Sequence, residues 1–73
     1  MTTKRVRCLI AGTVFQIHKV PGDTVVAKEA VLTVECMKME IPIESPCVGR
    51  LLSIDVKEGD SVAKDQQIFV LEV

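Results

Sequence analysis

The feature that most constrains this chain is an internal repeat with a spacing of 37 residues. When Gly12 is laid over Gly49, an offset of 49 − 12 = 37, identical or similar residues coincide in one register without gaps. The identical pairs include Gly12 with Gly49, Ile17 with Ile54, Gly22 with Gly59, Asp23 with Asp60, Val25 with Val62 and Glu35 with Glu72. The repeat therefore predicts two copies of one folding unit.

Each unit has the composition of β-structure. Its apolar residues are β-branched or bulky, and its segments are short and bounded by turn residues, so no helix fits. Strands are predicted at residues 6–10, 13–19, 24–25, 31–35, 39–44, 50–56, 61–62 and 68–72. A four-strand unit lacks a second face to bury, so we expect an all-β fold. The two copies should form a flattened eight-stranded barrel-sandwich of two four-stranded sheets related by a pseudo-two-fold axis.

Glycines and aspartates recur at equivalent places in the two units. The residues in these places are Gly12, Gly22, Asp23, Gly49, Gly59 and Asp60. Glycine supplies positive φ and aspartate hydrogen-bonds the nearby backbone, so Gly-Asp pairs are typical of tight turns. We interpret all six residues as structural turn residues that carry no chemistry.

Size and charge exclude several classes of function. A chain of 73 residues is near the lower limit for one core, so residues 1–73 are expected to form a single domain without a catalytic cavity. The balance of 9 basic against 10 acidic residues, with 2 Phe and no Tyr or Trp, disfavours nucleic acid as a partner. Neither a membrane-spanning run nor a signal peptide is found, which predicts a cytoplasmic protein, or a mitochondrial-matrix protein after loss of a presequence.

The cysteines and the histidine do not form a recognisable site. Cys8, Cys36 and Cys47 are widely spaced without a CxxC pair, so they are predicted to be reduced thiols that pack as small hydrophobic side chains. His18 stands alone, which is typical of a strand surface residue and not of a metal ligand or a catalytic base. The sequence therefore predicts no metal site.

One predicted hairpin combines two unfavourable features. A two-residue loop at Met37-Lys38 gives the cross-strand pairs Cys36 with Met39, Glu35 with Glu40, Val34 with Ile41 and Leu32 with Ile43. In this register the aliphatic pairs face inward and the two glutamates point outward side by side. Bulky residues in such a loop cost about 1 to 3 kcal/mol, and facing like charges cost about 0.2 to 1 kcal/mol. A small domain is expected to accept both costs only where function requires them.

These residues alone leave two interpretations of Lys38 open. It is either an ordinary solvated lysine on a hairpin tip, or a lysine that adaptable methionine side chains help to present to another protein. The repeat also predicts its location, because 38 + 37 = 75 lies just past the C-terminus. Lys38 is therefore expected at the end of the domain opposite to the chain termini.

The segment Glu35-Cys36-Met37-Lys38-Met39-Glu40 resembles the attachment signature of biotinyl domains, commonly Glu-Ala-Met-Lys-Met. The similarity extends from about Cys8 to the end of the chain. It implies that biotin is joined to Lys38 by an amide bond. It also implies that the flanking residues of the segment contact the ligase or the partner enzymes. Cys36 replaces the usual alanine, and residues 20–30 are too few to hold the protruding thumb of some bacterial acetyl-CoA carboxylase carriers.

By this resemblance the chain is a non-catalytic biotin carboxyl carrier. A biotin protein ligase would make biotinyl-adenylate, and the neutral amine of Lys38 would attack its acyl carbon. The biotin would then act as a swinging arm that shuttles carboxylate between biotin carboxylase and carboxyltransferase sites. The partners implied are therefore the ligase and the two catalytic sites of a biotin-dependent carboxylase.

The alternatives differ at the hairpin tip. Lipoyl carriers of oxo-acid dehydrogenases or glycine cleavage systems resemble this chain in fold, but they usually have Asp-Lys-Ala where this chain has Met37-Lys38-Met39. An unmodified structural module would not need Met-Lys-Met. A phosphocarrier would need a paired histidine site, and His18 is alone. Met37 and Met39 therefore favour biotin.

Overall fold

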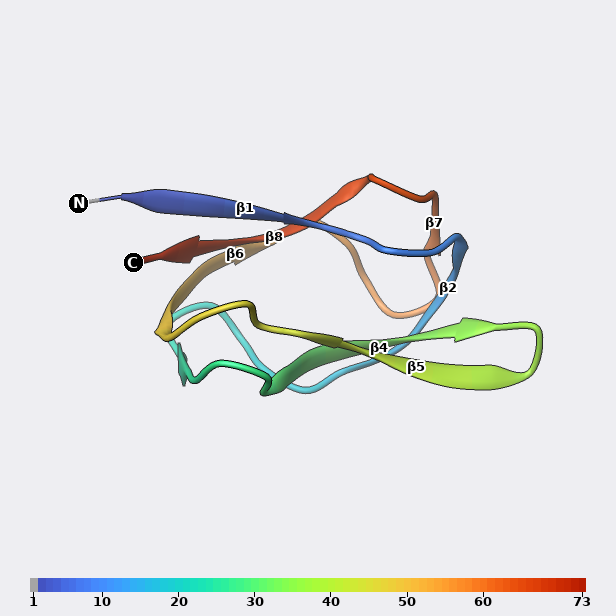
Figure 1. The fold of residues 1–73 in the computed structure, drawn as a ribbon. Coiled ribbons are helices and arrows are strands. Elements are labelled where there is room, and N and C mark those ends of the chain that lie inside the picture. Colours follow the sequence, from blue (N-terminus) through green and yellow to red (C-terminus); the bar gives the residue numbers. More distant parts are fainter. Residues whose placement is uncertain (1) are drawn as a thin grey trace.

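The computed structural model describes residues 2–73, and every regular element in this part of the chain is a strand. The strands are β1 (Thr3–Arg7), β2 (Gly12–Ile17), β3 (Thr24–Val25), β4 (Ala30–Cys36), β5 (Met39–Glu44), β6 (Gly49–Ile54), β7 (Ser61–Val62) and β8 (Gln67–Glu72). They form two antiparallel sheets of four strands, in the orders β1-β8-β6-β3 and β5-β4-β2-β7. The sheets are the layers of an elongated domain that measures 37 × 17 × 17 Å (Figure 1). The predicted all-β barrel-sandwich is confirmed.

The repeat relates the two sheets strand by strand. Adding 37 to the positions of β2 and β3 gives those of β6 and β7, and β4 and β1 map in the same way onto β8 and β5 to within one residue. Each unit contributes two strands to each sheet, so neither unit forms a sheet by itself. The hydrogen bonds follow the same offset. The Gly22 N–H donates to the Leu51 carbonyl at 2.7 Å, and the Gly59 N–H donates to the Val14 carbonyl at 2.8 Å.

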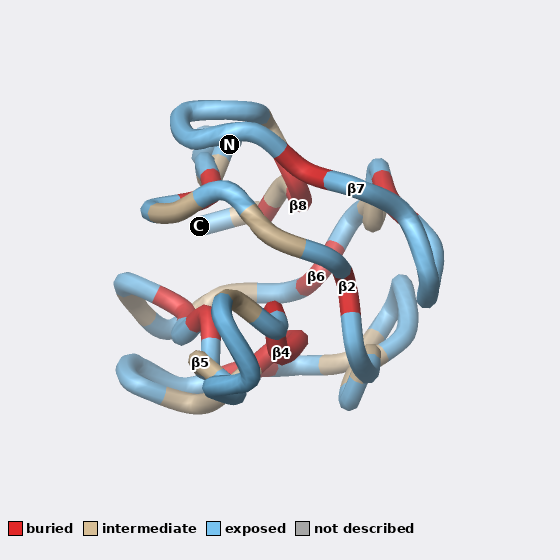
Figure 2. The backbone as a smooth tube through the Cα atoms, turned by 90° about the vertical axis from the view of Figure 1, so that its right-hand side faces the viewer, coloured by how far each residue is buried: buried red, intermediate tan, exposed pale blue. Residues whose placement is uncertain are grey.

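The core lies between the two sheets. Its buried hydrophobic residues are Cys8, Val14, Val25, Val31, Leu32, Val34, Ile43, Leu51, Val56, Val62, Ile68, Phe69 and Leu71. Strands of both sheets contribute buried residues, as the end-on view shows (Figure 2). Residues 2–73 contain no helix of the length and apolar character needed to cross a bilayer.

The first strand lies three residues earlier than the apolar residues predict. The prediction places a strand at residues 6–10, whereas β1 is Thr3–Arg7. Beyond it, the Cys8 N–H donates to the Gln66 carbonyl at 2.8 Å. β1 is an edge strand in which only Val6 is partly buried, and pairing with β8 fixes its place, so apolar content does not mark it. The strands predicted at 13–19 and 50–56 also end earlier, at Ile17 and Ile54.

Gly22 and Gly59 lie in tight turns with positive φ, at 102° and 93°. In each turn the following aspartate supports the backbone. The carboxylates of Asp23 and Asp60 accept hydrogen bonds from backbone N–H groups three residues earlier, at 3.0 and 2.9 Å. The two Gly-Asp pairs therefore have the geometry that their residue types favour.

The prediction that Gly12 and Gly49 are turn residues is wrong. They are the first residues of β2 and β6, and they permit a close approach between strands. A Cβ atom on Gly12 would lie 2.4 Å from the carbonyl oxygen of Glu35, and one on Gly49 would lie 2.7 Å from that of Glu72. These glycines are needed because there is no room for a side chain, and not because of their backbone angles.

Candidate functional site

β4 and β5 form a hairpin that projects at one end of the molecule (Figure 1). Its cross-strand pairs are Leu32 with Ile43, Val34 with Ile41, Glu35 with Glu40 and Cys36 with Met39. Leu32, Val34 and Ile43 are buried and Ile41 is partly buried, whereas the two glutamates are exposed. The predicted register is confirmed, and it leaves Met37 and Lys38 as the two residues of the tip.

The backbone of the tip is strained. Met37 has φ 52° and Lys38 has φ 66°, so both residues are in the left-handed region. This conformation suits the right-handed twist of the two strands, but for residues other than glycine it costs about 1 to 2 kcal/mol each. The hairpin therefore holds a bulky pair where glycine or asparagine would be the usual choice.

Met37→Gly is expected to raise the free energy of unfolding by about 0.5 to 1 kcal/mol, because relief of strain exceeds the added entropy of the unfolded chain. The Met37 side chain is 90% exposed, so its removal costs little packing. Met39→Gly is the control, since the same change in a regular strand should lower stability by about 0.5 to 1 kcal/mol. Urea denaturation measures the free energy of unfolding of both variants. Equal decreases in the free energy of unfolding of the two variants would show that the tip is not strained.

The side chains of the tip are open to solvent. Lys38 is exposed between Met37 and Met39, and the latter is 64% exposed. Within residues 2–73 the ion pairs are Lys19 with Glu29 at 2.7 Å and Arg50 with Glu72 at 3.5 Å, so the Lys38 amine takes part in neither. The tip therefore offers an amine that no described side chain holds or covers.

The Lys19–Glu29 ion pair lies at the other end of β4 from the tip. Its side-chain hydrogen bond raises the pKa of Lys19 and lowers the pKa of Glu29. Both groups are at the surface, where such pairs contribute little to stability. The pair therefore belongs to the scaffold and not to the candidate site.

The chain termini lie at the end of the molecule opposite to Lys38 (Figure 1). Thr2 and Val73 exchange two backbone hydrogen bonds there, at 3.3 and 2.8 Å. This pair is the repeat equivalent of Met39 with Cys36, because 2 + 37 = 39 and 36 + 37 = 73. The expected location of Lys38 is confirmed.

The remaining candidate residues do not come together. Cys36 is partly buried beside the tip, Cys8 is buried and Cys47 is partly buried, and all three are free thiols. His18 is exposed just beyond β2, with its Nε2 2.7 Å from the Thr33 hydroxyl. Residues 2–73 bring no three His, Cys, Asp or Glu side chains close enough to hold a metal ion.

Gly12 has a role at the base of the hairpin that its interpretation as a turn residue did not include. Gly12 of β2 packs against the carbonyl of Glu35, and the next residue, Thr13, pairs with Glu35 in the sheet. The signal was available, because Gly12 and Gly49 each directly precede a predicted strand. A glycine at the edge of a strand is typical of a close backbone approach.

A family model with the description "Biotin-requiring enzyme" matches residues 7–71. The chain belongs to this biotin/lipoyl family. It is therefore a biotin/lipoyl carrier domain, of the type that holds a covalently attached prosthetic group, either biotin or lipoic acid.

The names of similar proteins refer to biotin or to lipoyl groups. The biotin/lipoyl attachment protein of Bacillus subtilis is 38% identical over 62 residues, which are 85% of each chain. The dihydrolipoyllysine-residue acetyltransferase component of the pyruvate dehydrogenase complex from Cupriavidus necator is 37% identical over 62 residues. That match covers 85% of this chain and 11% of the acetyltransferase component.

Solved structures share the fold of this biotin/lipoyl domain. The urea carboxylase of Kluyveromyces lactis matches with a TM-score of 0.93 at 24% identity, over 99% of this chain and 6% of the carboxylase. A likeness at this identity establishes the fold. The family model and the names of the relatives are compatible with either prosthetic group.

Proposed function

We propose that this biotin/lipoyl domain is a biotin carboxyl carrier and that Lys38 is its attachment residue. The observation that carries the proposal is the tip itself, an exposed lysine between two exposed methionines on a two-residue turn. The sequence Met37-Lys38-Met39 resembles the biotinyl signature, whereas lipoyl domains usually have Asp-Lys-Ala in this place.

The geometry of the tip fits an amide-bonded prosthetic group. Only two residues separate the strands, so Lys38 lies at the very end of the hairpin. Its exposed amine can therefore enter the active site of another enzyme without local unfolding. An ammonium group must lose a proton before its nitrogen can attack an acyl carbon. Lys38 is therefore the substrate of a biotin protein ligase, which is expected to supply the base and the positioning.

The scaffold keeps Lys38 apart from the chain termini. Bound biotin would supply the nitrogen that takes up and gives up carboxylate. The domain supports this transfer by presenting Lys38 at one end of a 37 Å body while the termini lie at the other. Biotin carboxylase and carboxyltransferase sites are the proposed partners. Weak contacts with each suffice, because tethering within one assembly raises the effective concentration.

A lipoyl carrier is the second candidate. The similarity to an acetyltransferase component of a pyruvate dehydrogenase complex favours it, at 37% identity. The two candidates differ in which ligase accepts the tip. They share the fold, the attachment lysine and the absence of a catalytic role for the domain.

A direct choice between two ligases tests the proposal. The purified chain is incubated with biotin protein ligase, biotin and ATP, and separately with lipoate ligase, lipoate and ATP, and its intact mass is measured. One biotin adduct and no lipoyl adduct are expected. The double variant Met37→Asp, Met39→Ala places a lipoyl-like tip on the same scaffold. Its biotinylation rate should fall at least about tenfold, which corresponds to about 1.4 kcal/mol. A lipoyl adduct on the parent chain with no biotin adduct would replace the biotin proposal with the lipoyl one.

A further inference from the structure

The chain passes from one repeat unit to the other only at the hairpin tip. The first unit contains β1 to β4, the second contains β5 to β8, and the residues between β4 and β5 are Met37 and Lys38. Both residues have positive φ although neither is a glycine. The one covalent link between the two units is therefore a very short loop with a strained backbone.

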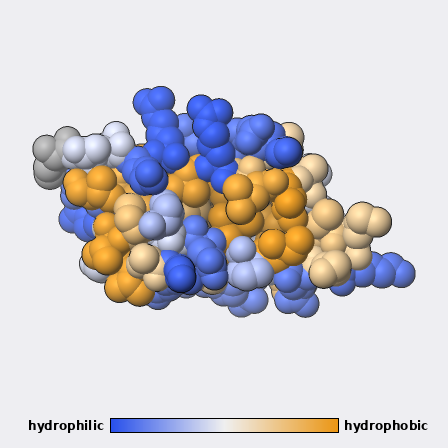
Figure 3. Space-filling view, viewed as in Figure 1, coloured by the Kyte–Doolittle hydropathy of each residue, from blue (hydrophilic) through white to orange (hydrophobic). Residues whose placement is uncertain are grey.

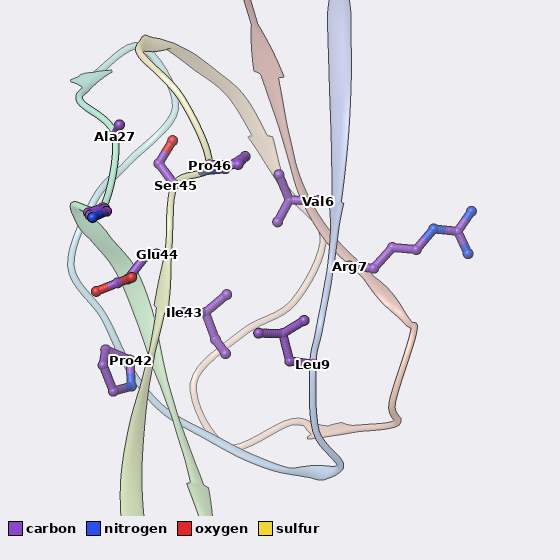
Figure 4. A pocket seen from close by; sticks show the side chains of 10 residues that line it. Val6, Arg7, Leu9, Ala27, Pro42, Ile43, Glu44, Ser45 and Pro46 are labelled. Atoms are coloured by element: carbon purple, nitrogen blue, oxygen red, sulfur yellow. The ribbon is translucent and has the colours of Figure 1, made fainter.

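The two units hold each other through contacts in both sheets. The pairings β1–β8, β3–β6, β4–β5 and β2–β7 each join a strand of one unit to a strand of the other. Apolar side chains also gather on the face between β1 and β5, which belong to different units (Figure 3). There Val6 and Leu9 of the first unit and Ile43 of the second point toward one another (Figure 4). Each unit therefore needs the other to complete both sheets and to bury its apolar residues.

These contacts do not require that both units belong to the same chain. If the tip opens into an extended conformation, the first unit of one copy can pair with the second unit of another copy, and the two remaining units pair in the same way. Every contact between units then forms twice, and positive φ at Met37 and Lys38 is no longer needed. Short strained loops between exchangeable elements are the usual sites of such exchange.

A second copy of this chain is favoured over any other partner because it carries the complementary unit. It alone supplies the register in which the Gly22 N–H donates to the Leu51 carbonyl at 2.7 Å and the Gly59 N–H donates to the Val14 carbonyl at 2.8 Å. We propose that the Met37-Lys38 tip is a hinge and that two copies of the chain exchange units through it to form an intertwined dimer.

The intertwined dimer would have no projecting tip. The extended segment from Cys36 to Met39 spans about 10 Å over three residues, so the two bodies would face each other across about that distance with Lys38 between them. Another enzyme needs about 800 Å² of surface for a specific contact, which so narrow a gap does not offer. The dimer is therefore expected to be closed to attachment at Lys38. This consequence rests on the proposed function, whereas the hinge does not.

Refolding at high protein concentration tests the hinge. The parent chain is unfolded in urea and refolded with a reductant at about 1 mM, the order of the effective concentration that a short linker supplies. Size-exclusion chromatography with light scattering should then show both monomer and dimer. Met37→Gly should lower the ratio of dimer to monomer at least about tenfold, because glycine accepts positive φ in the closed tip. Met39→Gly is the matched control. Met39 pairs with Cys36 in either form, so the ratio should equal that of the parent.

A disulfide distinguishes exchanged units from two closed chains in contact. Thr24 of β3 pairs with Arg50 of β6, so the double variant Thr24→Cys, Arg50→Cys places one new thiol on each unit. Oxidation of the isolated dimer should join two chains, whereas oxidation of the monomer should join each chain to itself. A denaturing gel without reductant separates these products. The parent chain, oxidised in the same way, is the control for its three own cysteines.

The outcomes separate the hinge from the proposed function. Equal ratios for Met37→Gly and Met39→Gly, a dimer whose chains separate on the gel, or no dimer at all would overturn the hinge and leave the proposed function standing. With biotin protein ligase, biotin and ATP, the isolated dimer should gain biotin at least about tenfold more slowly than the monomer, because the ligase cannot make its contact. Equal rates would overturn the closure of Lys38 in the dimer. No biotin adduct on the monomer would overturn the proposed function and leave the hinge standing.

Discussion

Gly12→Ala is expected to lower the free energy of unfolding by at least about 3 kcal/mol, the upper end of the usual cost of overpacking. The added Cβ would lie 2.4 Å from the carbonyl oxygen of Glu35 and 2.7 Å from Cγ1 of Val34. Val34 can adjust by rotation of its side chain, but the carbonyl belongs to the backbone of β4. Relief of the clash would therefore require β2 and β4 to separate where Thr13 pairs with Glu35.

A loss of this size is a large part of the stability of so small a domain. At about 0.05 to 0.15 kcal/mol per residue, a chain of 73 residues is expected to have about 4 to 11 kcal/mol in total. Gly12→Ala should therefore leave a measurable unfolded fraction or abolish folding. It should also disturb the hairpin that carries Lys38, because Glu35 is three residues before the lysine.

Two other glycines provide controls with smaller expected decreases in the free energy of unfolding. Gly49→Ala should cost about 1 to 3 kcal/mol, because its Cβ would lie 2.7 Å from the Glu72 carbonyl, which is slightly more room. Gly22→Ala would meet nothing within 4 Å, so its cost should be the strain at φ 102° alone, about 1 to 2 kcal/mol. Chemical denaturation followed by circular dichroism gives the three values. A Gly12→Ala variant as stable as Gly22→Ala would contradict the close contact between β2 and β4.

The hairpin could be predicted in detail because its signals are local. Alternation of buried and exposed residues on both sides of Met37-Lys38 determines which pairs face inward, and a shift by one residue would expose Val34. The turn length then follows from the pairing of Cys36 with Met39. Neither inference needs information from distant parts of the chain.

The first strand could not be found from local signals. Thr3–Arg7 has charged residues and little buried surface, and its strand conformation depends on pairing with β8 at the far end of the sequence. The repeat contained the missing information. Subtracting 37 from the predicted strand at 39–44 gives 2–7, which includes the whole of β1. The repeat therefore predicts this strand better than its apolar content does.

The two roles of glycine, in turns and at close contacts, also could not be told apart from the residue type. Glycine is selected both for positive φ and for close contact, and the residue type does not distinguish the two causes. Gly22 is followed by an aspartate, which is a turn signal, whereas Gly12 is followed by the β-branched residues of a strand. The distance from Gly12 to Glu35 depends on the pairing of β2 with β4, which only the assembled sheet reveals.

The largest functional effect is expected at Lys38. Arginine keeps the positive charge and the length of the side chain, but its guanidinium is not a nucleophile near neutral pH. Lys38→Arg should therefore abolish attachment while leaving the fold intact. Lys28 is the matched control, because it is also exposed and also in the left-handed region, with φ 70°. It lies outside the two-residue tip, so Lys28→Arg should be modified like the parent chain.

The most direct test is the intact mass of the parent chain, Lys28→Arg and Lys38→Arg after complete reaction with biotin protein ligase, biotin and ATP. We expect one biotin adduct on the parent and on Lys28→Arg, and none on Lys38→Arg. A biotin adduct that persists on Lys38→Arg, or a folded parent chain that accepts none, would contradict the assignment of Lys38 as the biotin attachment residue.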